Sequence, residues 1–459
     1  MQTLLPLLNW FNRERITLLM GSFALVLGAI EPWYNLPPHA LEAFGINLSV
    51  INAGRILAAL FATIGFAFAL WFRIDRAPRL LFWSGIIAVL LVPYLVTTYA
   101  PTVTLVAKAY YEQGQQINKH VEVNFPQVQS QWKQNIPLEQ SSPITSTFFS
   151  IQDSRFFQLS SWDEIWTRGL GYSNHFFGFI GQGWVFTAIG LAIGLTAFYL
   201  GLADQTLDLF LVDMSKALPW VGLVAGIVGF SLLVPNLINH ELDTMFAKGE
   251  YHPVVTISRT LAAWYPPLQG DEEFLQRRAA AGFYDGEPDP ALINVAKGLE
   301  RYHLRDYLKA EDYFQQAVAI EPSQFFARQY LATTIVNQGV SYFNDGKNRK
   351  PGAAIDRFEA ALKIFPGHLE AMYDLMLARV VNGEFNQSSR VARQLIQDLS
   401  HFHKPSFSLL GQAYLHSSWA SYHNGDLNQA WKQYRQSIDN TAWDKPINEE
   451  ALHPFDEGG

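Results

Sequence analysis

The sequence has 459 residues, of which 49% are hydrophobic and 16% are charged, and its formal net charge is −8. The negative charge and the lack of a basic patch argue against a nucleic-acid partner. The absence of cysteine excludes disulfides, thiolate metal sites, iron–sulfur clusters and cysteine nucleophiles.

Charge is distributed unevenly along the chain. Residues 1–238 hold 12 Lys/Arg and 13 Asp/Glu, whereas residues 239–459 hold 21 and 28. A soluble domain usually carries about 25% charged residues, so the first part is poor in charge. We therefore predict a membrane domain over residues 1–240, embedded in a lipid bilayer, and an acidic, water-exposed region after it.

Five apolar segments of the first part are long enough, or nearly so, to cross a bilayer, which takes about 20 helical residues. Arg55 lies early in the second segment, and we expect its side chain to extend to the membrane interface. A polar outer loop over residues 101–175 separates the third segment from the fourth. The five predicted spans are residues 16–36, 51–72, 80–100, 176–202 and 217–238.

Basic residues indicate the orientation of these spans. Arg13 and Arg15 precede the first span and three arginines lie between the second and third, whereas residues 31–50 contain no Lys or Arg. The positive-inside rule then places the N-terminus in the cytoplasm and the C-terminal region on the periplasmic or lumenal side. A multi-span anchor of this kind suits a bacterial plasma membrane or a thylakoid.

Two glycine pairs occur in the last two spans, Gly190/Gly194 and Gly222/Gly226. Four-residue spacing places each pair on one helix face, where small residues let backbones approach closely in lipid. The pairs predict packing of spans four and five through these faces, and they also offer a route to oligomers. The alternative is that membrane helices are simply rich in glycine.

An internal repeat follows Pro290. Residues 305–322, 351–366, 383–397 and 425–439 share one helical pattern around a small residue. The aligned positions are Ala310, Ala354, Ser388 and Ala430; then Phe314, Phe358, Ala392 and Tyr434; then Ala317, Ala361, Leu395 and Ser437.

This pattern resembles the tetratricopeptide repeat (TPR), in which a small residue lets two antiparallel helices touch and an aromatic ring fills the space beside it. The family's period is 34 residues, and the spacings here of 44, 34 and 42 indicate insertions. The resemblance implies an all-α chain, with the five-span domain followed by a TPR-like α-solenoid over residues 290–445 and a tail over 446–459. Residues 241–289 are either a linker or a degenerate helical pair.

In this family the first helix of each pair lines a concave groove that binds a peptide segment. Mapping that face onto this sequence gives a candidate peptide groove rich in aromatic residues, which suits an apolar or proline-containing partner. The alternative is that many of these rings fill gaps between repeats. The candidate residues are Tyr302, His303, Phe343, Asn344, Tyr373, Trp419, Tyr422 and His423.

No motif for catalysis is apparent. The sequence lacks a nucleophile elbow, a zincin motif and a Walker loop. His401 and His403 lack a third metal ligand of suitable spacing. We therefore expect no cofactor, no metal and no enzymatic activity.

The favoured interpretation is a membrane-anchored scaffold that binds a protein partner for complex assembly or envelope organisation. The first alternative is an envelope polysaccharide ligase or polymerase, or a transport component, with Arg155 and Arg168 as candidate catalytic groups in the outer loop. The second alternative is a membrane sensor, which is disfavoured because the predicted topology leaves no cytoplasmic output domain.

Overall fold

The computed structural model describes residues 13–36, 44, 52–71, 79–99, 103, 105, 106, 109, 179–200, 206–343, 348–399 and 407–439. The chain divides into two compact units. The N-terminal unit comprises Met1–Leu36, Ile46–Thr104 and Leu159–His240, and the C-terminal unit comprises Pro37–Gly45, Leu105–Gln158 and Glu241–Gly459. Within the described residues all regular secondary structure is helical, apart from one isolated bridge between Tyr34 and Ile180.

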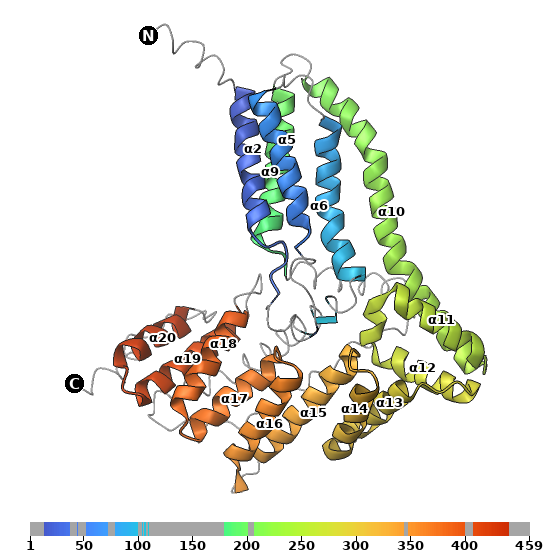
Figure 1. Cartoon of the computed structure of the whole chain (residues 1–459), viewed down its shortest axis with the longest axis vertical. Helices are drawn as coiled ribbons and strands as arrows, with labels where there is room; N and C mark the ends of the chain where they lie inside the picture. Colours follow the sequence, from blue (N-terminus) through green and yellow to red (C-terminus); the bar gives the residue numbers. More distant parts are fainter. Residues whose placement is uncertain are drawn as a thin grey trace. The chain divides into compact units, whose positions relative to one another are not determined.

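The N-terminal unit contains four helices that pack together, α2 (Arg13–Ile30), α5 (Gly54–Leu70), α6 (Arg79–Tyr99) and α9 (Gln182–Leu200) (Figure 1). Its core contains an aromatic cluster, in which Phe61, Phe82 and Phe198 form a chain of edge-to-face contacts at 5.3 and 4.8 Å between ring centroids. Such contacts contribute about 0.5–1.5 kcal/mol each beyond their buried area.

Within the part of the chain that the structure describes, three helices are long and apolar enough to cross a membrane. These are α6, α9 and α10 (Thr206–Ala247), with apolar windows at Arg79–Val96, Gln182–Leu200 and Phe210–Ala247. Helix α5 is apolar but has 17 residues, and the first turn of α2 carries three charged residues. The number of crossings and their orientation stay predictions.

Two predicted spans have limits that differ from those of the helices in the structure. Helix α2 ends at Ile30, not at residue 36, because a residue before proline, here Glu31 before Pro32, disfavours the helical region. Helix α10 covers residues 206–247 without interruption, although the prediction began its span at 217 and ended it at 238. Pro219 and Pro235 both lie inside this helix.

The C-terminal unit is a succession of helices in which each contacts the next along the chain (Figure 1). The segment 241–289, predicted as a linker or a degenerate pair, holds two helices, α11 (Tyr251–Trp264) and α12 (Glu272–Asp285), joined by the short 3-10 helix η5 (Pro266–Gly270). Four further pairs follow it. They are α13 (Pro290–His303) with α14 (Tyr307–Ile320), α15 (Phe325–Phe343) with α16 (Pro351–Ile364), α17 (Leu369–Val381) with α18 (Phe385–Leu399), and α19 (Phe407–His423) with α20 (Leu427–Asp439).

The same turn joins the two helices in three of these pairs. Arg305, Gly383 and Gly425 occupy it with φ of 60°, 77° and 81°. Each donates its N–H to the carbonyl three residues earlier, and the next residue donates to the carbonyl five residues before itself. This is the Schellman motif, which normally takes glycine because of its left-handed residue.

The residues aligned by the internal repeat occupy equivalent places in the second helix of each pair. All twelve are at most 8% exposed, and the four small residues that start the pattern, Ala310, Ala354, Ser388 and Ala430, are fully buried. Each of these four donates its N–H to the backbone oxygen of the residue four positions earlier. The sequence repeat therefore corresponds to a repeated packing environment.

Candidate protein-binding surface

Two glycines mark the contact within the α13/α14 and α15/α16 pairs. A Cβ added to Gly298 would lie 2.7 Å from Cε1 of Phe314, and one added to Gly339 would lie 2.6 Å from Cε1 of Phe358. Residues four positions apart share one face of a helix. Tyr302 and Phe343 are four residues after these glycines, so both point into the packed seam.

Tyr302 and Phe343 are accordingly buried. Tyr302 is 2% exposed and its hydroxyl accepts a hydrogen bond from Nδ2 of Asn337 at 3.2 Å. Its ring lies 5.3 Å from that of Tyr330, and burial raises its pKa well above the ordinary value. Phe343 is also buried, and the guanidinium of Arg349 lies 4.9 Å from its ring centroid. The alternative prediction, that rings fill gaps between repeats, describes these two residues.

His303 lies at the edge of this seam. Its Nε2 lies 2.6 Å from Oε1 of Glu272, in the first turn of α12, and its side chain is 33% exposed. The contact connects α13 to the preceding helix pair. His303 therefore joins two neighbouring pairs as well as facing solvent.

The structure gathers three of the remaining candidates, Trp419, Tyr422 and His423, near the end of α19. The ring of His423 lies 4.7 Å from Trp419 and stacks on Phe385 of α18 at 4.4 Å with an interplanar angle of 7°. Trp419 and Tyr422 lie 6.2 Å apart. Tyr422 is 40% exposed and His423 is exposed. We call Phe385, Trp419, Tyr422 and His423 the α19 aromatic patch.

Phe385 was absent from the candidate groove because it belongs to a second helix. Gly383, two residues earlier, marks the turn that leads into α18 and so places Phe385 beside the end of the preceding helices. Turn position and aromatic type together are the signal that could have identified it.

Tyr373 lies within a buried polar strip on α15, α17 and α19. Burial raises the pKa of Tyr373 and that of its neighbour Asp374, which is 1% exposed. The ring of Tyr373 lies 6.3 Å from that of His416, whose pKa burial lowers to about 4. Tyr373 and His416 are therefore neutral at pH 7.

His368 occupies the other side of this strip. Its Nδ1 accepts from the N–H of Ala371 at 3.3 Å, which caps α17, and its Nε2 lies 3.1 Å from the hydroxyl oxygen of Thr333 on α15. The Thr333 hydroxyl donates to the backbone oxygen of Gln329 at 3.0 Å. Nε2 of His368 therefore carries the proton and donates to Thr333, and complete burial lowers the pKa of His368 to about 3.

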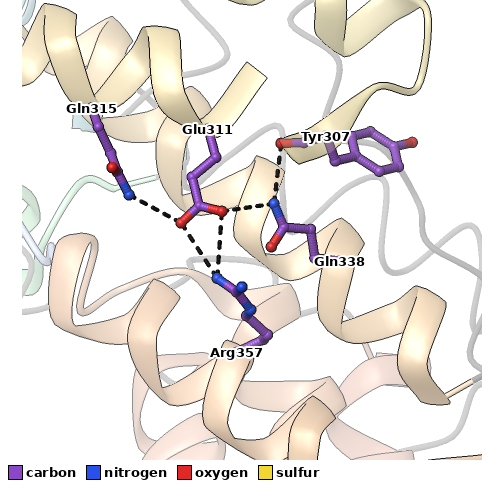
Figure 2. Close-up of polar contacts among 5 residues, drawn as sticks. All are labelled: Tyr307, Glu311, Gln315, Gln338 and Arg357. Carbon is purple, nitrogen blue, oxygen red and sulfur yellow. Dashed lines mark hydrogen bonds and ion pairs between the residues drawn. The ribbon is translucent and has the colours of Figure 1, made fainter. Parts of the chain in front are cut away.

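A polar network connects α14, α15 and α16 (Figure 2). Glu311 accepts from Gln338 at 2.8 Å, from Gln315 at 3.0 Å and from Arg357 at 3.3 and 3.4 Å. Gln338 also donates to the backbone oxygen of Tyr307 at 3.0 Å. The carboxylate thereby fixes the orientation of one helix pair against the next.

The glycine pairs of the predicted spans have different surroundings. A Cβ on Gly190 would lie 2.7 Å from Leu25 on α2, and one on Gly194 would lie 2.7 Å from Phe82 on α6. Among the described residues, nothing outside the local backbone of α10 lies within 4 Å of a Cβ placed on Gly222 or Gly226. Gly190 and Gly194 of α9 therefore face α2 and α6, not α10. The small residues Gly21 and Gly28 of α2, seven apart and so on one face, supply the matching surface.

Several candidates lie outside the described residues. They are Asn344, the pair His401 and His403, and the outer-loop residues Arg155 and Arg168. Among the residues that the structure does describe, no group of three or more His, Asp or Glu side chains is placed to hold a metal ion.

Comparison with known proteins gives no family for this chain. No protein-family model matches the sequence, and no curated protein matches it.

Proposed function

We propose that this protein is a membrane-anchored TPR-type scaffold that binds a protein partner for complex assembly or envelope organisation. The observation that carries this proposal is the repeated packing environment of the helix pairs. Each pair contacts its neighbours in sequence order, an arrangement used by repeat proteins to present extended binding surfaces. Its action is binding, without chemical turnover.

The α19 aromatic patch is the proposed contact for the partner. Binding hot spots are enriched in Trp and Tyr, which offer large contact areas with few rotatable bonds. Tyr422 and His423 are exposed beside the partly buried Trp419 and Phe385. A segment with apolar or proline residues would stack on these rings.

The anchoring part of the proposal rests on apolar helices of membrane-spanning length. The distribution of arginines supports a cytoplasmic N-terminus and a C-terminal unit on the periplasmic or lumenal side. C-terminal fusions to alkaline phosphatase and to green fluorescent protein in a bacterial host test this topology. Phosphatase activity without fluorescence is expected, and the reverse pattern would contradict it.

Partner binding can be tested by photo-crosslinking in intact membranes. A benzophenone amino acid at Tyr422 is expected to give one discrete crosslinked protein, whereas the same probe at Leu308, which is 64% exposed on α14, is expected to give none. Tyr422→Ala in a chain probed at His423 should lower the yield. Equal crosslinking from Leu308, or no product from either position, would contradict the scaffold role at this surface.

A further inference from the structure

Phe44 contacts the edge of the C-terminal unit formed by the start of α15 and the end of α16. Its ring centroid lies 4.8 Å from that of Phe325 and 5.5 Å from that of Phe365. The guanidinium carbon of Arg328 lies 4.3 Å from the centroid of the same ring. Phe44 belongs to the segment Pro37–Gly45, which is part of this unit although it precedes α5 in the sequence.

Phe325, Phe365 and Arg328 each contact the ring of Phe44. Phe325 and Phe365 are both buried, and their rings meet edge to face at 5.8 Å. The third contact is Arg328. Its Nη2 donates to the backbone oxygen of Ile364 at 3.0 Å, which orients the guanidinium over the ring of Phe44. Aromatic rings favour edge-to-face partners, and a guanidinium is attracted to the face of a ring.

We propose that Phe325, Arg328 and Phe365 form a binding pocket for an aromatic side chain, and that its occupant is Phe44 of the same chain. The contact is intramolecular, so it stands whether or not a partner binds elsewhere on the unit. It ties the segment between the first two predicted spans to the helix pairs.

This contact constrains the number of membrane crossings. Phe44 and α15 must lie on one side of the bilayer, so an even number of crossings separates residue 44 from residue 325. Helices α6, α9 and α10 lie between residues 44 and 325 and are long enough to span the membrane, which gives three crossings. Among the described helices between them, α5, an apolar helix of 17 residues, is the remaining candidate and supplies the fourth.

Photo-crosslinking of the full-length protein in membranes tests the pocket directly. A benzophenone amino acid at Phe44 is expected to crosslink within the same chain to peptides containing Phe325, Arg328 or Phe365. The same probe at Phe283, an exposed residue of the same unit, is the matched control and should not label them. Crosslinks from Phe44 to other segments, or none, would overturn the proposal.

Hydrogen–deuterium exchange of the full-length protein provides a second measurement. Phe44→Ala is expected to raise exchange about tenfold in the first turns of α15, because an aromatic and a cation–π contact are lost. Phe44→Trp should keep most of the protection, and Phe283→Ala should leave it unchanged. Unchanged exchange in Phe44→Ala would overturn the proposal.

The parity of the crossings can be tested with cysteine labelling, since the chain has no cysteine of its own. Single cysteines placed by Ala40→Cys and by Leu304→Cys are expected to react with a membrane-impermeant maleimide added to the same side of the membrane. Labelling from opposite sides would overturn the assignment of α5 as a crossing helix and the contact with it.

Discussion

Arg55, in the first turn of α5, donates from Nε to the backbone oxygen of Ala29 in the last turn of α2, at 2.8 Å. Arg15, in the first turn of α2, donates from Nη1 to the backbone oxygen of Ala69 in the last turn of α5, at 3.1 Å. The two helices are therefore antiparallel, and each provides a cation to the other's C-terminus. The carbonyls there have no partner within their own helix, and the helix dipole favours positive charge beside them.

Arg55→Ala should destabilise the N-terminal unit by about 1–2 kcal/mol, because it removes both a charged hydrogen bond and a favourable dipole interaction. Thermal unfolding of the full-length protein in detergent measures the effect. Arg13→Ala, which removes an exposed arginine from the same turn of α2 as Arg15, is the control and should have little effect. Equal effects of the two substitutions would argue against the reciprocal caps.

Gly339→Ala should destabilise the C-terminal unit by about 1–3 kcal/mol, because the added methyl group would lie 2.6 Å from the ring of Phe358. Gly352→Ala is the matched control, since nothing lies within 4 Å of its added methyl group and alanine is the better helix former. Thermal unfolding should show a lower melting temperature for Gly339→Ala than for Gly352→Ala. Combining Gly339→Ala with Phe358→Leu should recover part of the loss, and an unchanged double variant would contradict the close contact.

Arg305→Gly should stabilise the protein by about 1 kcal/mol. Arg305 holds φ of 60° at a turn position that glycine occupies in two other pairs, and the left-handed conformation costs an L-residue roughly 1–2 kcal/mol. Gly383→Ala at the equivalent turn should destabilise the protein instead. Chemical unfolding measured on both variants checks the pair, and a destabilised Arg305→Gly would mean that the arginine side chain has a role of its own.

Stability of the C-terminal unit should fall below pH 6.5. The pKa of His368 is lowered to about 3 in the folded state, so between pH 6.5 and 3 only the unfolded chain binds the proton. The contribution of His368 to the free energy of unfolding is fully present above pH 6.5 and decreases at lower pH. At pH 5 this residue alone lowers the free energy of unfolding by about 2 kcal/mol.

His368→Asn isolates this effect, because asparagine is a good helix N-cap and does not titrate. The difference in apparent melting temperature between pH 7 and pH 5 should shrink, while His416 maintains a residual dependence. A pH dependence that His368→Asn does not alter would contradict the assignment.

The repeated part of the fold could be predicted well because its signal is local. Spacing alone identified Ala310, Phe314 and Ala317 and their counterparts, and all are buried in second helices. Pro266 and Gly286 lie just after the ends of α11 and α12, and proline and glycine commonly follow the end of a helix. These residues act on neighbours within a few positions in the chain.

Contacts between distant segments could not be predicted in the same way. The sequence predicted that Arg55 reaches the membrane interface, and it did not identify the hydrogen bond from Arg55 to the carbonyl of Ala29, because a backbone acceptor has no sequence signature. Gly190 was paired with the following span, whereas α2 is its neighbour. Tyr302 was assigned to a groove because the face of a helix can be read from spacing, but which helix covers that face cannot.

The carboxylate of Glu311 has a mechanical consequence. Because it joins α14 to α15 and α16 through Gln338 and Arg357, a force applied at the C-terminus cannot extend one of these helix pairs while leaving the other folded. Residues 290–364 should then extend in a single event that releases roughly 250 Å of chain. With Glu311→Gln, which weakens this link, the same length should be released in two steps in an optical-tweezers trace.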